Sequence, residues 1–178
     1  MRSARASGLA AWVERGVRWA FTHVPGVSRI WFHGDRGLRG ASGLAHLRVP
    51  LCEATVGLVT TGGLYHRDQP SFQTREESPI GDGSHRELDL ERGTDTLAFR
   101  HDWYDHTDAE RDLNLVLPYE RLRELEDERI IGRAHPKAIS LMGHVEGEAE
   151  RRLEHETVPR IAAFCERERL DAVLLVPA

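Results

Sequence analysis

Imidazole and carboxylate side chains gather in one short segment of the sequence, directly after the strand expected at residues 96–100. The segment contains His101, Asp102, Asp105 and His106. These groups can exchange protons near neutral pH or ligate a divalent cation, so they suit acid–base catalysis or a metal centre. Their spacing matches no zinc motif such as HExxH. A substrate contact is a further alternative, and so is a solvated acidic loop whose Asp108 caps the following helix.

Hydroxyl groups and glycines form a second candidate site, immediately after the β-branched and apolar residues 54–59. This turn consists of Thr60, Thr61, Gly62 and Gly63. Glycines let backbone N–H groups approach an anion, and threonine hydroxyls add further donors, so a carboxylate or a phosphate could bind here. The alternative is a tight turn that only leads the chain out of the first strand.

A third candidate is His144, which follows an apolar run and Gly143. An imidazole at the carboxyl end of a buried strand can meet a ligand and titrate near neutral pH. A structural histidine is the alternative interpretation of this position.

The order of helices and strands predicts how these three segments come together. Apolar strand patterns alternate with helical patterns, with strands expected at 54–59, 96–100, 139–144 and 172–176 and helices at 118–127 and 146–170. This alternation predicts an α/β fold with a mostly parallel sheet flanked by helices. Ligands bind beyond the carboxyl ends of such strands, which is where all three candidate segments lie.

The sequence also predicts the local structure of several individual segments. Residues 65–83 are polar and predict a long loop, and the charged residues 84–90 predict a short edge strand. The last apolar run, 172–176, shows no alternation, so a strand buried on both faces is expected. Pro159 should kink the helix 146–170 or start its second half.

The sequence predicts a two-part organisation. Residues 1–50 are expected to form an amphipathic helix at 8–24, followed by a glycine-rich irregular segment. Residues 51–178 form the α/β domain. The net charge of −5 gives no support for nucleic acid or an anionic membrane as a partner. No stretch is long and apolar enough to span a membrane. Cys52 and Cys165 form no CxxC pair, so a reduced, cytoplasmic protein is expected.

Several of these motifs, in this order, resemble the selenoprotein B family of glycine, sarcosine, betaine and D-proline reductases, in its short stand-alone form. The resemblance covers residues 54–178. Its motifs are VTTGG at 59–63, DGSHRE at 82–87, His101 with Tyr104-Asp105, LVLPYERL at 115–122, ISLMGH at 139–144, and the terminal DAVLLVPA at 171–178.

The resemblance implies a selenocysteine or cysteine directly after the last apolar strand, followed by a further segment with another cysteine. We therefore expect the chain to stop just before a selenocysteine codon that was read as a stop, so that the α/β domain is incomplete at its C-terminus. No other cofactor is expected in this chain. The strand 172–176 would then lack cover on one face, which invites a homo-oligomer through the exposed apolar surface.

The implied activity is reductive cleavage of a C–N bond in a small amine or amino-acid derivative, with electrons from a thiol or selenol protein. Thr60, Thr61, Gly62 and Gly63 would hold a substrate carboxylate. His101 and His144, with Asp102 and Asp105, would orient or protonate the leaving amine. Two other functions stay open: a non-catalytic module that binds a small anion, and a metal-dependent hydrolase or lyase that uses the His101–Asp108 cluster.

Overall fold

The computed structural model describes residues 45–102 and 104–178 of the chain. Contacts within the chain divide it into two units, Met1–Ala45 and His46–Ala178, and the helices and strands described below belong to the second unit. The amphipathic helix predicted at 8–24 and most of the glycine-rich segment lie outside the described residues.

The centre of the fold is a four-stranded sheet in the order β3-β5-β1-β6. Its strands are β1 (Thr55–Thr60), β3 (His85–Asp89), β5 (Arg133–Leu141) and β6 (Ala172–Val176). β1 pairs in parallel with both β5 and β6, whereas β3 runs antiparallel to β5 at the edge. The predicted mostly parallel α/β sheet is therefore confirmed, and so is the charged edge strand.

A second, two-stranded sheet pairs β2 (Leu64–His66) with β4 (Leu97–Phe99) in antiparallel orientation. The strand predicted at 96–100 is therefore present, but outside the main sheet. The prediction of a continuous loop over 65–83 was wrong at its start, because β2 occupies its first residues. A three-residue strand is too short to show a periodic pattern, and only its pairing with residues more than thirty positions away defines it.

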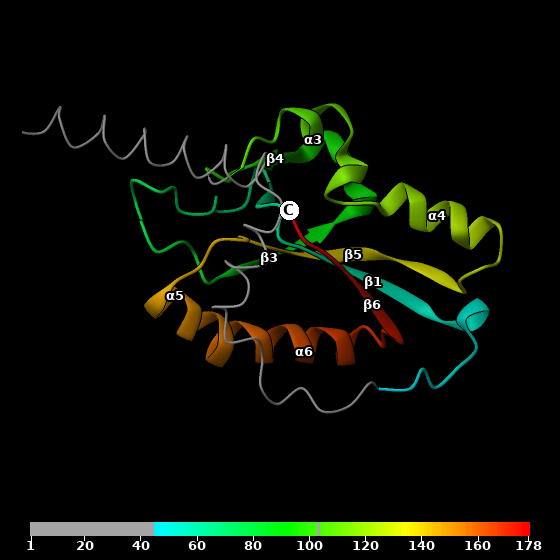
Figure 1. Ribbon diagram of the computed structural model, residues 1–178. Helices are drawn as coiled ribbons and strands as arrows, with labels where there is room; N and C mark the ends of the chain where they lie inside the picture. Colours follow the sequence, from blue (N-terminus) through cyan, green and yellow to red (C-terminus); the bar gives the residue numbers. More distant parts are fainter. Residues whose placement is uncertain (1–44, 103) are drawn as a thin grey trace, which may run out of the picture. The chain divides into compact units, whose positions relative to one another are not determined.

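Helices cover both faces of the main sheet (Figure 1). The helices α3 (Thr107–Arg111) and α4 (Tyr119–Asp127) lie on one face, and α5 (Gly147–Arg152) and α6 (Val158–Arg167) on the other. A π-helical stretch, Leu153–Thr157, joins α5 to α6, and Pro159 stands in the first turn of α6. Proline cannot donate a backbone hydrogen bond, so the predicted break in this helix takes the form of a widened turn just before Pro159.

Each face of the sheet has its own apolar core. Towards α4, Val56 and Leu58 of β1 pack with Leu122 of the helix. Towards α6, Val59 of β1 packs with Ile139 of β5 and Phe164 of the helix. Neighbouring β1 residues thus serve opposite cores, which explains why this strand has no polar alternation.

β6 differs from the expectation for it, because it is an exposed edge strand and not a buried central one. Val173, Leu174 and Leu175 are 38%, 41% and 69% exposed. An unalternating apolar sequence predicts cover on both faces, but in β6 only Ala172 and Val176 are partly buried, packed against the core beneath α4. The expectation of a strand buried on both faces was therefore wrong, whereas the exposure agrees with the expectation that this strand lacks cover.

Candidate active site

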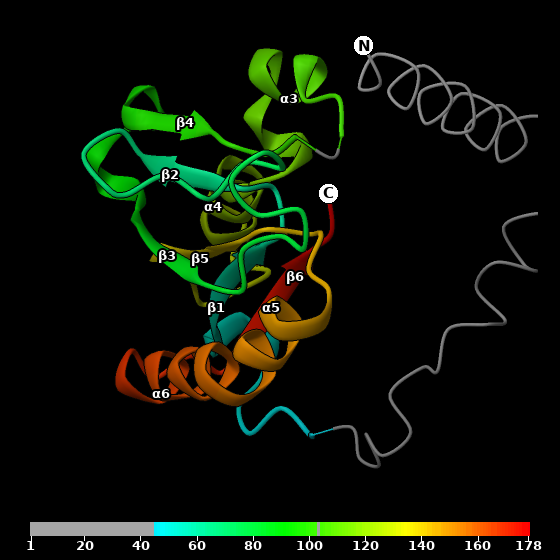
Figure 2. The same cartoon turned by 90° about the vertical axis from the view of Figure 1, so that its left-hand side faces the viewer.

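Four chain segments meet at the carboxyl end of β1. They are the turn 60–63 after β1, the residues 142–144 after β5, the end of β6 at Ala178, and His101, which follows β4. An isolated antiparallel bridge joins Gly62 to Met142, and the Gly63 N–H donates to the Leu141 carbonyl at 2.9 Å. Figure 2 shows the chain end beyond β6 at this edge of the sheet. The predicted convergence of the strand-end segments is present in the fold.

The turn 60–63 uses its backbone donors within the protein. The Thr61 N–H donates to the Val176 carbonyl at 3.1 Å, and the Gly62 N–H donates to the Thr60 hydroxyl at 3.1 Å. Together with the Gly63 bond to Leu141, this engages three consecutive N–H groups. An anion at this turn would therefore rely on the half-buried Thr61 hydroxyl, and not on a cradle of backbone amides.

The end of β6 is held against the turn by side-chain and backbone contacts. The Ala178 N–H donates to the Thr61 hydroxyl oxygen at 2.9 Å. Gly143 lies against the same two groups, since a Cβ added to it would sit 3.2 Å from both the Ala178 carbonyl and the Thr61 hydroxyl oxygen. Glycine suits this position, because a Cβ here would be in tight contact with the ends of both strands and could be accepted only if they moved apart by a few tenths of an ångström.

His101 lies inside this arrangement and not at its surface. Its side chain is only 3% exposed, and its Nε2 accepts the Gly143 N–H at 3.2 Å. Burial lowers the pKa of His101 to about 4; Asp102 opposes this shift, whereas His106 and His144 add to it. The ring is therefore neutral at physiological pH and bound to the backbone of the β5 end.

Tyr104 completes the packing around His101, and the predicted set of site residues did not include it. Its ring meets the His101 ring edge-on, with 4.6 Å between centroids, and its hydroxyl donates to the Gly62 carbonyl at 3.2 Å. Burial raises the pKa of Tyr104 to about 12, so the hydroxyl keeps its proton. An aromatic residue with a polar tip beside a histidine cluster is the sequence signal that could have identified it.

His144 is the more accessible of the two predicted histidines. Its side chain is 30% exposed, and its Nε2 lies 3.5 Å from the Glu146 carboxylate. It directly follows Gly143, so its backbone lies at the edge where the four segments meet. Accessibility of this kind is what a group that exchanges protons with a substrate needs.

The two predicted aspartates have different neighbours. The Asp102 carboxylate accepts the Arg75 N–H at 2.9 Å, which ties the long loop to the site. Asp105 accepts from the Thr107 N–H and hydroxyl at 3.0 and 2.6 Å, one residue before the N-cap His106 of α3. The expectation that Asp108 caps this helix was wrong, because the helix begins one residue earlier and Asp108 lies within it.

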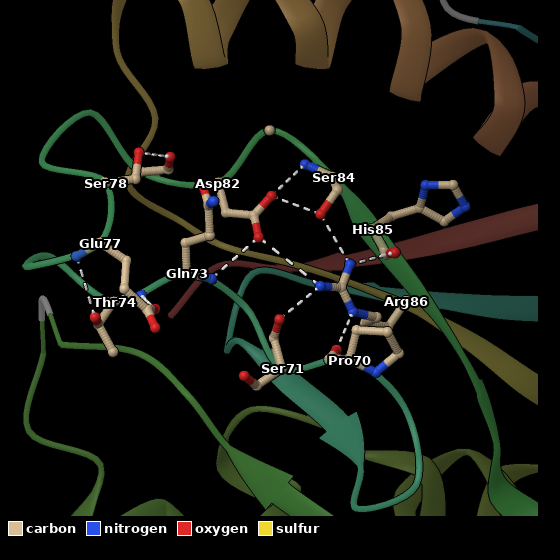
Figure 3. Close-up of polar contacts among 12 residues, drawn as sticks. Pro70, Ser71, Gln73, Thr74, Glu77, Ser78, Asp82, Ser84, His85 and Arg86 are labelled. Carbon is tan, nitrogen blue, oxygen red and sulfur yellow. Dashed lines mark hydrogen bonds and ion pairs between the residues drawn. The ribbon is translucent and has the colours of Figure 1, made fainter.

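A buried polar network fixes the loop that precedes β3 (Figure 3). The Asp82 carboxylate accepts the Ser84 N–H and hydroxyl at 2.9 and 2.5 Å and the Gln73 N–H at 3.1 Å. Burial would raise the pKa of Asp82, but the hydrogen bonds from Ser84 and Gln73 and the charge of Arg86 bring it below its usual value. The carboxylate thus stays ionised.

Arg86 closes the same network from the other side. Its guanidinium donates to the Pro70 and Ser71 carbonyls at 2.6 and 2.9 Å and to the Ser84 hydroxyl at 2.8 Å. It also lies 4.3 Å from the centre of the fully buried Phe72 ring. Gly83 packs so closely on the Ala149 backbone of α5 that a side chain there would collide with it. The DGSHRE motif is therefore the frame of the loop.

Metal and thiol chemistry find little support in the described part of the chain. Among residues 45–102 and 104–178, no three histidine, cysteine or acidic side chains gather as metal ligands. The His106 Nε2 lies 3.1 Å from the Glu110 carboxylate and pairs with it. Cys52 is exposed and Cys165 is half-buried, and burial raises the pKa of the Cys165 thiol, which therefore stays protonated at neutral pH.

Taken together, the fold and the strand-end groups define an α/β protein whose polar groups gather at the carboxyl ends of parallel strands, the usual ligand position of this class. Residues 47–177 match the family described as glycine/sarcosine/betaine reductase selenoprotein B. The chain belongs to this family, and the resemblance found in its motifs is confirmed.

Curated relatives support the same assignment. The chain is 31% identical over 125 residues to the D-proline reductase subunit gamma of Acetoanaerobium sticklandii, covering 70% of this chain and 49% of that protein. It is 31% identical to the glycine reductase complex component B subunit gamma of Symbiobacterium thermophilum, covering 70% of this chain and 28% of the relative. The protein of that name from Carboxydothermus hydrogenoformans is 33% identical over 95 residues, 53% of this chain and 22% of the relative.

The chain thus spans half or less of the length of these relatives, which are by name subunits of reductase complexes. No solved structure matches the chain significantly. Within the described residues, none of the helices is both long enough and apolar enough to cross a membrane.

Proposed function

We propose that this chain forms the strand-end part of the active site of a reductase that cleaves a C–N bond in a small amine or amino-acid derivative. Membership of the selenoprotein B family supports the reaction class. The observation that carries the proposal is the contact between the end of β6 and the site, in which Ala178 binds the Thr61 hydroxyl at 2.9 Å.

The geometry suits a nucleophile at the position that follows Ala178. The Ala178 carbonyl lies next to Gly143, where a Cβ would be in tight contact with it and with the Thr61 hydroxyl oxygen, so Thr61 and the β5 end closely border the chain end. A selenocysteine or cysteine at that position would supply the nucleophilic selenolate or thiolate. The chain's own residues would then orient the substrate and handle its protons.

His144 is the residue proposed to protonate the departing amine. It combines partial exposure, a neighbouring carboxylate on Glu146 and a position at the end of β5. His101, the other predicted histidine, is buried, and its Nε2 accepts the Gly143 N–H, so this nitrogen cannot supply a proton. The Thr61 hydroxyl is the proposed contact for a substrate carboxylate, together with Gly62 and Gly63 as its close neighbours.

The overall reaction would break one C–N bond and form one C–H bond and one N–H bond. It needs two electrons and two protons, and we propose that a dithiol or selenol-thiol protein supplies them and is oxidised to the disulfide or selenenylsulfide. A small amine or amino-acid substrate and this electron-donor protein are therefore the proposed partners. The proposed location is the cytoplasm, where such thiols stay reduced.

The nucleotide sequence directly after the Ala178 codon gives the first test. An in-frame UGA codon followed by an open reading frame with a further cysteine would support the proposal. A UAA or UAG codon with no frame beyond it would leave the site without its nucleophile and refute the proposal for this chain.

The second test is an assay of the complete protein. It would be incubated with a dithiol reductant and, one at a time, glycine, sarcosine, betaine and D-proline, and the released amine or ring-opened product would be measured. Product that depends on both the reductant and the residue after Ala178 is the expected result. Product formation that survives replacement of that residue by alanine would contradict the proposal.

A further inference from the structure

The hydrogen bond between His101 and Gly143 fixes the tautomer of a buried histidine. The Gly143 N–H can only donate, so His101 Nε2 must accept it at 3.2 Å and cannot carry a proton. A neutral imidazole has one proton, which therefore lies on Nδ1. This assignment follows from the hydrogen-bond partner and makes Nε2 unable to act as an acid.

The surroundings keep this ring uncharged. His101 is almost completely buried, and the edge of the Tyr104 ring packs against it. Of the titratable groups that face it, Asp102 favours the imidazolium ion, whereas His106 and His144 disfavour it. Protonation would also place an N–H group against the Gly143 N–H, so it would break the bond that holds the β5 end.

The bond holds Gly143 in close contact with the ends of two neighbouring strands. A Cβ on Gly143 would be 3.4 Å from His101 Nε2 and 3.2 Å from both the Ala178 carbonyl and the Thr61 hydroxyl oxygen. The next residue in the chain is His144, whose backbone position is therefore set by the same contact. The acceptor on His101 thus holds Gly143 against the end of β6. Through the chain it also positions the backbone of the accessible His144.

We propose that His101 is a positioning residue, which holds Gly143 and His144 against the chain end through a neutral ring, and that its unprotonated Nε2 serves as an acceptor and donates no proton. The assignment of a site at this edge rests on the proposed function, but the state of the His101 ring does not.

His66 provides an internal comparison for this role. It is 1% exposed, its Nε2 accepts the Asp89 N–H at 2.9 Å, and its Nδ1 lies 2.8 Å from the Thr96 hydroxyl. Both buried histidines accept a backbone N–H through Nε2, but His66 lies in β2 and contacts β3 and the residues before β4, away from the site. Changes at His66 report on the loss of a buried histidine as such.

The test is long-range ¹H–¹⁵N NMR of the histidine rings in the full chain between pH 5 and 8.5, with His101→Gln and His66→Gln used to assign the two signals. An unprotonated Nε2, a protonated Nδ1 and no titration of His101 across this range are expected. A His101 ring that titrates near pH 6.5, or that carries its proton on Nε2, would overturn the proposal.

Amide hydrogen exchange of Gly143 gives a second readout. His101→Leu removes the acceptor, and Gly143 exchange is expected to accelerate by about tenfold or more, whereas His101→Gln should restore protection through its amide oxygen. His66→Leu should leave Gly143 unchanged. Equal Gly143 protection in the wild type and His101→Leu would refute the role.

The NMR and exchange measurements still test the proposal if a variant does not fold or if the complete protein is inactive. If His101→Leu does not fold, the ring state of the unmodified chain still decides the proposal. If the complete protein cleaves no amine, the proposed function fails while the NMR and exchange results stand by themselves.

Discussion

The Asp82–Arg86 network and the turn 60–63 are built from similar residues but have different roles. Both place a hydroxyl beside a glycine at the boundary of a strand. Ser84 lies between a buried carboxylate and a buried guanidinium, and its hydroxyl is bonded to both. Thr61 is half-buried, and its hydroxyl oxygen holds the chain end at Ala178. The first motif is a closed network, while the second ends at an edge where several segments meet.

This difference shows that one family motif supports the structure of a loop while another lies at the candidate site. The network fixes the long loop, and the loop in turn reaches the site where the Arg75 N–H binds Asp102. The turn after β1 depends on that frame, because its own backbone donors are already used for holding β5 and β6. Substitutions in the two regions should therefore separate stability from activity.

The largest effect is expected when the closed network is opened. Asp82→Ala leaves the Arg86 guanidinium, only 12% exposed, without its carboxylate and removes three hydrogen bonds, so unfolding free energy should fall by about 3 kcal/mol or more. Urea denaturation measures this. Asp108→Ala is the matched control, since its ion pair with Arg111 is largely exposed and should contribute little. Equal effects of the two substitutions would show that the network is not a frame.

The site and the Asp82–Arg86 network should also lose stability at different pH values. The pKa of His101 is about 4 in the folded protein against 6.5 for an ordinary histidine, so the unfolded state takes up a proton first as the pH falls. The contribution of His101 to the free energy of unfolding is therefore complete above pH 6.5. It is lost as the pH falls towards 4, by up to about 3 kcal/mol. Asp82, whose pKa is lowered, loses its contribution only below its usual value of 3.8.

Denaturation curves between pH 7 and 4 measure the His101 share. His101→Gln should show a flatter dependence of unfolding free energy on pH than the wild type, with His66 accounting for part of the remaining slope. Parallel curves for the two proteins would mean that His101 titrates alike in the folded and unfolded states.

His144→Ala tests the open side of the comparison. In the complete, active protein it should lower kcat by about 100-fold, the typical contribution of a general acid, while stability changes little. His155→Ala is the control, because this exposed histidine lies in the π-helical stretch between α5 and α6. Unchanged turnover in His144→Ala would make this histidine structural and leave the proton donor to be sought elsewhere.

The smallest effect is expected at Thr61. Thr61→Val keeps the shape of the side chain but removes the acceptor for the Ala178 N–H, so unfolding free energy should fall by about 1 kcal/mol, whereas Thr61→Ser should retain the bond. Amide exchange at Ala178 reports the contact directly. If Thr61→Val exchanges as slowly as the wild type, the hydroxyl does not hold the strand end.

Much of the fold could be predicted from the sequence, because local patterns carry it. Apolar runs indicated β1 and the last three residues of β5, which spans Arg133–Leu141, the charges of residues 84–90 indicated β3 as an edge, and Pro159 marked the break between α5 and α6. β2 could not be found in this way, since three residues carry no period and their pairing partner is distant in the sequence. The exposure of β6 also depends on which neighbours the fold supplies.

For the site, the sequence determined which groups are present, and that they follow strands whose carboxyl ends meet. Only the tertiary structure decided what each group does. Whether an imidazole is an acid or an acceptor depends on its burial and on the partner of each ring nitrogen, and these come from residues far along the chain. His101 and His144 have the same side chain, yet a backbone N–H from Gly143 makes one a buried acceptor, while the other remains accessible at the end of β5.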